Sequence, residues 1–145
     1  MPQAKTREPR GKLAVGRASR RDEAVLDEGG LRSDSVLWDF SEDGGAADAA
    51  IPLGRKLPAG ALVVRLWTDE RTAVTGADDT DLLVGSTAIN SAAIDFTGDV
   101  GIQARTATPY EVAAGGEEMS VIFNSNAATA GQVRFFVEYL LPTDA

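Results

Sequence analysis

The 145-residue sequence contains no histidine and no cysteine. These two absences exclude Ser-His-Asp hydrolysis, cysteine nucleophiles, disulfide bonds and ordinary zinc sites, because each depends on one of the missing residue types. Without cysteine, the sequence gives no information on the redox state of its compartment. No apolar run reaches the roughly 18 residues of a membrane-spanning helix. We therefore expect no membrane partner.

Carboxylates are abundant, but they lack the spacing of a catalytic or metal site. The densest cluster is residues 78–81, DDTD, which lacks the alternating acids and glycine of a calcium-binding EF-hand loop. A second group surrounds a Gly-Ala-rich stretch that cannot position a pair of acids for glycoside hydrolysis: Asp39, Glu42, Asp43 and Asp48. The glycine pairs 44–45 and 115–116 lack the Lys-Ser/Thr of a phosphate-binding loop, and we interpret both as turns. We expect no enzyme, no cofactor and no metal.

Positive charge is concentrated at the N-terminus of a chain whose net charge is −8. Within residues 1–21, Glu8 is the only acid beside seven basic residues: Lys5, Arg7, Arg10, Lys12, Arg17, Arg20 and Arg21. The rest of the chain is strongly acidic, which disfavours a nucleic acid partner because phosphate repels it. A basic tail on an acidic body is typical of an interaction arm.

Residues 1–32 show no sustained hydrophobic period, so we assign them as the arm and residues 33–145 as the folded domain. A disordered tail, and an arm that orders on a neighbouring subunit or scaffold, both remain open. A nucleic-acid-binding tail is disfavoured, since the aromatic residues used for base stacking are missing. If the arm binds a surface, its apolar anchors are Leu13, Val15, Val25, Leu26 and Leu31.

The domain contains short β patterns separated by turns rich in glycine and proline. We predict about eight strands, at residues 35–40, 50–53, 61–68, 81–87, 100–106, 110–113, 119–124 and 131–141. Residues 69–79 are predicted to be a polar connection, and Gly85 a bulge. The pattern predicts an all-β, antiparallel β-sandwich or jelly-roll-like body.

Residues 131–141, GQVRFFVEYLL, form the longest β pattern, and Pro142 ends it. One face carries Val133, Phe135, Val137, Tyr139 and Leu141. We predict a central strand paired with residues 61–68. The other face includes Arg134, Phe136, Glu138 and Leu140, which is too apolar for free solvent, so we expect loops of the other sheet or a sister subunit to cover it.

Four aromatic residues allow two interpretations: Trp38, Trp67, Tyr110 and Tyr139. If they share an exposed face, they form a sugar-stacking platform. The favoured alternative places Trp38 and Tyr139 in the core and Trp67 at a subunit interface beside Arg65, because exposed tryptophan and arginine are frequent interface anchors. The predicted interface residues are Arg65, Trp67, Arg134 and Phe136.

Three stretches resemble a known family when taken together: LPAGALVVRLWTDERTAV, DLLVGST and QVRFFVEYLLP. They are similar, over roughly residues 57–142, to the capsid decoration (cement) proteins of tailed bacteriophages. The resemblance implies a β-sandwich on the outer capsid surface of the virion, often a trimer, that clamps neighbouring major capsid subunits, sometimes through an N-terminal arm. It implies no catalytic residues.

The expected function is therefore structural stabilisation of a phage capsid, with the major capsid protein and copies of this chain as partners. The alternative is a carbohydrate- or receptor-binding β-sandwich module of a fibre or spike. That alternative requires exposed aromatic side chains on one face.

Overall fold

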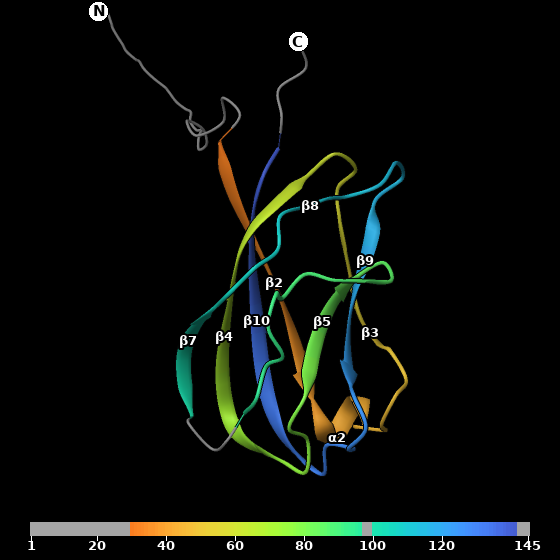
Figure 1. The fold of residues 1–145 in the computed structure, drawn as a ribbon, viewed down its shortest axis with the longest axis vertical. Coiled ribbons are helices and arrows are strands. Elements are labelled where there is room, and N and C mark those ends of the chain that lie inside the picture. The colour runs from red at the N-terminus through yellow and green to blue at the C-terminus, as the bar shows by residue number, and fades with distance from the viewer. Residues whose placement is uncertain (1–29, 97–99, 142–145) are drawn as a thin grey trace, which may run out of the picture. The chain divides into compact units, whose positions relative to one another are not determined.

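The computed structural model describes residues 30–96 and 100–141 (Figure 1). The predicted arm residues from Lys5 to Leu26 lie outside this range. The chain divides into a body, Ser33–Tyr139, and a second unit made of Met1–Arg32 and Leu140–Ala145. In the second unit, Leu31 and Leu140 are both exposed.

The body is built from two antiparallel sheets, which confirms the predicted β-sandwich (Figure 1). The first sheet has the order β2-β10-β4-β7, with β8 also paired to β4, and the second has the order β3-β9-β5-β6. The strands are β2 (Leu31–Asp39), β3 (Ile51–Leu57), β4 (Leu62–Thr75), β5 (Thr80–Val84), β6 (Thr87–Ala88), β7 (Gly101–Arg105), β8 (Tyr110–Glu111), β9 (Glu117–Phe123) and β10 (Ala130–Leu140).

The predicted position of the last strand is confirmed. β10 lies between β2 and β4, so it is central in its sheet and is paired with the strand that the sequence suggested. Val133, Phe135 and Val137 are fully buried, and Tyr139 is nearly so. The side chains between them are only half-buried, as the alternation of a strand with one face toward the core requires.

The two sheets meet in an aromatic contact. Trp38 of β2 is fully buried against Phe123 of β9, with ring centroids 4.9 Å apart and an edge-to-face geometry. The indole Nε1–H of Trp38 donates a hydrogen bond to the carbonyl oxygen of Gly44 at 2.8 Å. Burial of this side chain and of Tyr139 agrees with the prediction that both belong to the core.

The end of the first predicted strand is different. Phe40 was predicted to be the last residue of the strand 35–40, but it begins the short helix α2 (Phe40–Asp43) and is exposed. Asp39 is the N-cap, because its Oδ1 accepts hydrogen bonds from the backbone N–H and the hydroxyl of Ser41. Gly44, with φ of 76°, ends the helix. Capping by a polar side chain here overrides the strand pattern.

β4 is longer than predicted and changes its phase. The expected polar connection 69–79 was wrong in its first half, since β4 continues to Thr75 and Glu70 pairs with Gly101 of β7. Val63 and Leu66 are both buried, with Arg65 exposed between them. Strict alternation along the predicted strand 61–68 would place Val63 on the same face as Arg65 and Trp67. Val63 is instead buried like Leu66, so the alternation of buried and exposed residues shifts by one position between them.

Gly85 forms a tight turn and not the predicted bulge. Val84 pairs with Thr87, so the β5–β6 hairpin is closed by the two residues Gly85 and Ser86. Gly85 has a φ of 62°, which glycine adopts at little cost. A Cβ atom at this position would lie 2.2 Å from Oε2 of Glu117, so the turn also brings the backbone close to that carboxylate.

Glu117 connects three segments through its carboxylate. Its Oε1 accepts hydrogen bonds from the backbone N–H of Ala113 at 3.0 Å and from the hydroxyl of Tyr110 at 2.5 Å. These bonds lower the pKa of Glu117 below its ordinary 4.5, the Ala113 bond having the larger effect. The same contact raises the pKa of Tyr110, chiefly through the hydrogen bond to Glu117.

The Glu117 contact predicts a pH-dependent contribution to stability. The folded-state pKa is the lower one, so ionised Glu117 stabilises the fold above pH 4.5, and this contribution is lost as the pH falls through the folded-state value. The free energy of unfolding in urea should therefore differ between wild type and Glu117→Gln at about pH 6, and the difference should shrink by about pH 3. A difference that stays constant over this range would contradict the assignment.

Candidate protein interaction surface

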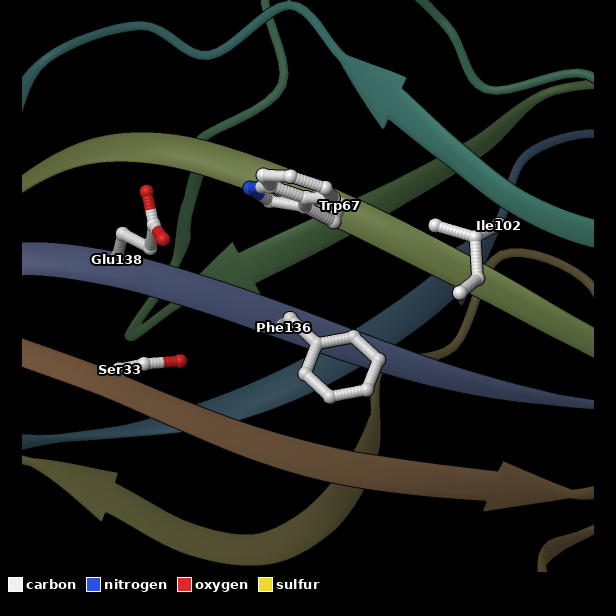
Figure 2. A pocket seen from close by; sticks show the side chains of 5 residues that line it. All are labelled: Ser33, Trp67, Ile102, Phe136 and Glu138. Carbon is white, nitrogen blue, oxygen red and sulfur yellow. The ribbon is translucent and has the colours of Figure 1, made fainter.

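The outer face of the first sheet carries an apolar groove lined by residues of four strands. Figure 2 shows its lining: Ser33, Trp67, Ile102, Phe136 and Glu138. We call it the Trp67 groove. Ile102 is 67% exposed and Trp67 is 37% exposed, although both are large apolar side chains. Contiguous exposed apolar groups on a soluble domain mark interaction sites.

Strand alternation explains why these side chains share one face. Trp67 and Asp69 lie on β4 opposite Ala104 and Ile102 of β7, respectively. Their neighbours in sequence, Leu66 and Thr68, are buried on the inner face. Phe136 and Glu138 have the same outward phase on β10, next to β4 in the sheet. The two central strands β10 and β4 and the two edge strands β2 and β7 therefore build the groove.

In two ion pairs near the groove, the arginine side chain is more exposed than the carboxylate. Arg65 contacts Glu138 at 3.1 Å, and Arg71 contacts Asp69 at 3.7 Å. The arginine side chains are 62% and 51% exposed, whereas the carboxylates are 20% and 23% exposed. A molecule that approaches this face meets guanidinium groups beside apolar side chains.

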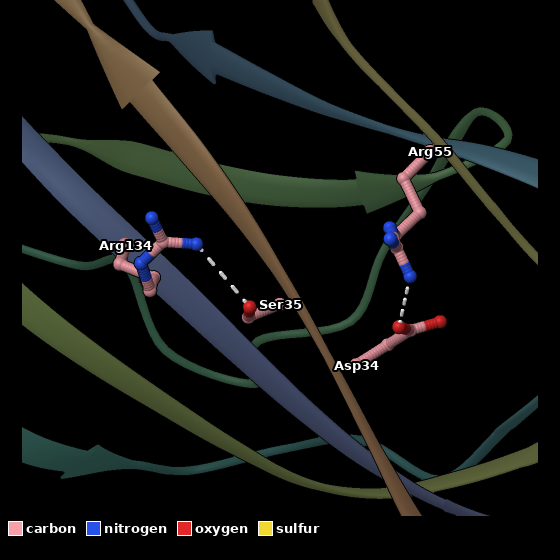
Figure 3. A network of polar contacts seen from close by, with 4 residues as sticks. All are labelled: Asp34, Ser35, Arg55 and Arg134. Atoms are coloured by element: carbon pink, nitrogen blue, oxygen red, sulfur yellow. Dashed lines mark hydrogen bonds and ion pairs between the residues drawn. The ribbon is translucent and has the colours of Figure 1, made fainter.

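Arg134 completes the predicted set at the β2 side of β10. Its Nη1 donates to Oγ of Ser35 at 3.3 Å, and Asp34 on β2 forms an ion pair with Arg55 on β3 (Figure 3). The structure thus places Arg65, Trp67 and Phe136 around the groove, with Arg134 on the same strand face as Phe136. Whether copies of the chain meet there stays a prediction.

The four aromatic residues do not form a sugar-stacking platform. Trp38 and Tyr139 are buried, and the Tyr110 hydroxyl is engaged by Glu117. Trp67 is the member of this set that lies on the exposed face of the groove. The arrangement required for the carbohydrate-binding alternative is therefore absent from these four residues.

The acidic stretch 78–81 is engaged by asparagine side chains. The Nδ2 of Asn124 donates to Asp79 at 3.2 Å and to Asp81 at 3.0 Å, and Asn126 donates to Asp78 at 3.0 Å. Within the described ranges, no group of three or more candidate ligands could hold a metal ion. These carboxylates connect the loops at the ends of β4 and β9.

In the same described ranges, no helix has the length and apolar character needed to cross a membrane.

Sequence reasoning missed two features near this surface. Ile102 was assigned to a strand but not to the groove, because its position opposite Asp69 depends on the pairing of β4 with β7. Glu70 was placed in a loop, yet it is 1% exposed on the inner face of β4. Its Oε2 accepts a hydrogen bond from the backbone N–H of Val74 at 2.7 Å, while its Oε1 has no hydrogen-bond partner among the residues that the structure describes.

Arg105 lies on the inner side of the same sheet and carries the only charge of β7. Its Nε donates to Oγ1 of Thr68 at 2.9 Å, and its guanidinium lies 5.2 Å from the ring centroid of Phe96. Burial lowers the pKa of Arg105, and the negative charges of Glu70 and Asp95 act in the opposite direction. The outward surface of β7 is consequently uncharged.

The fold and the exposed groove define an all-β sandwich with a surface suited to protein contact. No protein-family model matches the sequence, and neither does any curated protein. Two solved structures share the fold. One is a chain in the capsid asymmetric unit of cyanophage Pam1, with a TM-score of 0.57 and 21% identity over 94% of this chain and 98% of that chain.

The other is a chain in the acidic stable capsid structure of Helicobacter pylori bacteriophage KHP30. It has a TM-score of 0.51 and 17% identity, and the match covers 78% of this chain and 89% of that chain. At these identities the similarity establishes a common fold. Both neighbours come from bacteriophage capsid structures, the source that the sequence resemblance suggested.

Proposed function

We propose that the protein is a non-enzymatic structural component of a bacteriophage virion. In this proposal it binds the outer surface of the assembled capsid and stabilises it by clamping neighbouring major capsid subunits. The observation that carries the proposal is the match to a chain of the Pam1 capsid over nearly the full length of both chains. The exposed Trp67 groove supports it, since a structural protein of an assembly needs a surface to be covered.

We further propose that the body acts as a homotrimer whose copies meet through Arg65, Trp67, Arg134 and Phe136. Covering the groove removes large apolar side chains from water, at roughly 25 cal/mol for each Å² of apolar area. Exposed aromatic and arginine side chains are the residue types most often found as interface anchors. Three copies in one particle would also multiply any weak contact to the capsid.

The basic segment 1–32 is proposed as the arm that holds a neighbouring capsid subunit. If fully extended, a segment of this length spans about 100 Å, at about 3.3 Å per residue. Exposed ion pairs contribute only about 0–1 kcal/mol each. Ordering the arm costs about 1–2 kcal/mol per residue. Its lysines and arginines therefore need its apolar residues as additional anchors.

Deletion of residues 1–29 tests the proposed arm and leaves β2 complete. We expect the shortened chain to remain folded and to keep its oligomeric state, while its binding to purified capsids that lack this protein falls at least about tenfold, a loss of about 1.4 kcal/mol. Capsid binding is measured by co-sedimentation, and protection by the temperature at which the capsids open.

The matched control is a full-length chain in which Lys5, Arg7, Arg10 and Lys12 are changed to glutamine, which keeps the length and removes charge. A partial loss with this control assigns part of the binding to charge. If the deletion variant protects capsids as well as the full chain does, the arm has no clamping role. Glycan binding that is lost in Trp67→Ala, without capsid binding by the wild type, would favour the fibre or spike alternative.

A further inference from the structure

The edge of the first sheet at β7 has no strand beside it. β7 pairs with β4 along residues 66–70, and the described residues contain no strand on its other side (Figure 1). Beyond Arg105 the chain pairs with the segment after β6, where the N–H of Ser91 donates to the carbonyl oxygen of Thr106. The open part of the edge is therefore β7 itself. An open edge presents backbone donors and acceptors that can pair with another chain.

The edges of the second sheet are protected, whereas β7 is not. β3 has Pro52 in its register, an irregularity between Pro52 and Lys56, and two adjacent cations. β6 contains only two residues. Proline, charge, bulges and short strands are the devices that prevent edge-to-edge contact. β7 has none of them on its outward surface, because the charge of Arg105 is directed inward.

Apolar side chains at this edge continue into the Trp67 groove. Ile102 is the most exposed large apolar residue in the described ranges, at 67%, and Val100 follows at 57%. Ala104 lies opposite Trp67. A strand added beside β7 would place its outward side chains against Ile102 and close the open side of the groove.

Charge favours a second copy, joined head to tail, as the occupant. The described residues of the body contain 15 acidic and 6 basic residues, and the exposed guanidinium groups of Arg65 and Arg71 flank the groove. A two-fold contact centred on the groove would bring the arginines of the two copies close together, and like charges at close range are unfavourable. A head-to-tail contact sets them against the acidic remainder of the next copy.

The opposite edge of the same sheet supplies a suitable strand. Among the described residues β2 is paired only with β10, and from Ser33 to Asp39 it contains no basic residue and two acids, of which Asp34 pairs with Arg55 and Asp39 caps α2. We infer that β7 of one copy pairs with β2 of the next, which continues the sheet from copy to copy and places the next copy beside the β7 side of the Trp67 groove at each junction. A head-to-tail contact between two different surfaces closes into a ring when the rotation allows it. The inference rests on the proposed homotrimer and specifies how its copies join.

The full chain and two variants test the pairing. Ile102→Lys adds a charge to the open edge at an exposed position, and Ser86→Lys adds the same charge on an exposed turn of the other sheet. Light scattering should give a mass of three copies for the wild type and for Ser86→Lys. The concentration at which half of the Ile102→Lys trimers dissociate should rise at least about 30-fold, as for loss of an interface hot spot.

Hydrogen exchange distinguishes strand pairing from other contacts. Backbone amides in residues 33–39 and 101–105 should exchange more slowly at high than at low wild-type concentration, and Ile102→Lys should remove that difference. A monomeric wild type, a dimer, or a trimer whose β7 amides exchange at a concentration-independent rate would each overturn the inference. Co-sedimentation of the same samples with capsids tests the proposed function separately: capsid binding by a monomer refutes the pairing and leaves the function in place.

Discussion

Replacing Trp38 with alanine is expected to lower the free energy of unfolding by about 3–5 kcal/mol, the usual cost of truncating a buried aromatic side chain. Trp38 is fully buried where the two sheets meet, and its ring packs edge-to-face on Phe123. The variant also leaves the carbonyl oxygen of Gly44 without the indole donor. Equilibrium unfolding in urea, followed by far-UV circular dichroism, measures the change.

Trp67→Ala is the matched control, because it removes the same side chain from an exposed position of the same sheet. A surface substitution of this kind should change the free energy of unfolding of the dissociated chain by less than about 1 kcal/mol. Both variants are therefore compared at a concentration where the wild type is monomeric. Equal losses at the two positions would mean that Trp38 is not the contact that joins the sheets.

The second large effect is expected for Glu70→Ala, at about 2–4 kcal/mol of lost stability, since a buried N–H and a partly buried cation lose their partner. The carboxylate accepts a hydrogen bond from the backbone N–H of Val74 in the same strand, so it links the two ends of the segment 70–74. Of the two carboxylates whose negative charge raises the pKa of Arg105, Glu70 has the larger effect and Asp95 the smaller. Alanine supplies neither contact, and thermal or urea unfolding quantifies the loss.

Glu70→Gln separates the two contributions. Glutamine keeps an oxygen for the Val74 N–H but removes the attraction for Arg105, so its loss should be about half that of alanine. Asp69→Ala is the control on the outward face, where an exposed ion pair contributes only about 0–1 kcal/mol. If Glu70→Ala unfolds with the wild-type midpoint, the buried carboxylate does not hold β4 in place.

Local sequence patterns were sufficient for the parts of the fold in which alternation is simple. β10 is regular along its length, and its position as a central strand and its buried valine and phenylalanine residues follow from the pattern alone. Trp67 and Phe136 were likewise predicted on the outward face, since strand alternation groups Trp67 with Arg65 and Phe136 with Arg134 and Glu138.

The remaining errors come from contacts between segments that are distant in sequence. The stretch TDER contains a typical combination of loop residues, yet Thr68 and Glu70 are buried because β7 brings Arg105 beside them. Charged residues are rarely buried unless they are paired, and a sequence pattern does not show the partner. The sequence did not predict Ile102 as part of the groove for the same reason, because its position there depends on the register between β4 and β7.

The burial of one tryptophan and the exposure of the other give the molecule two separate optical reporters. Trp38 lies in the core, so its fluorescence follows the separation of the sheets during unfolding. Trp67 lies in the groove, so its emission should shift to shorter wavelength when the groove is covered, with the core unchanged. Trp38→Phe and Trp67→Phe assign the two signals, so that assembly and unfolding can be followed independently in one unlabelled sample.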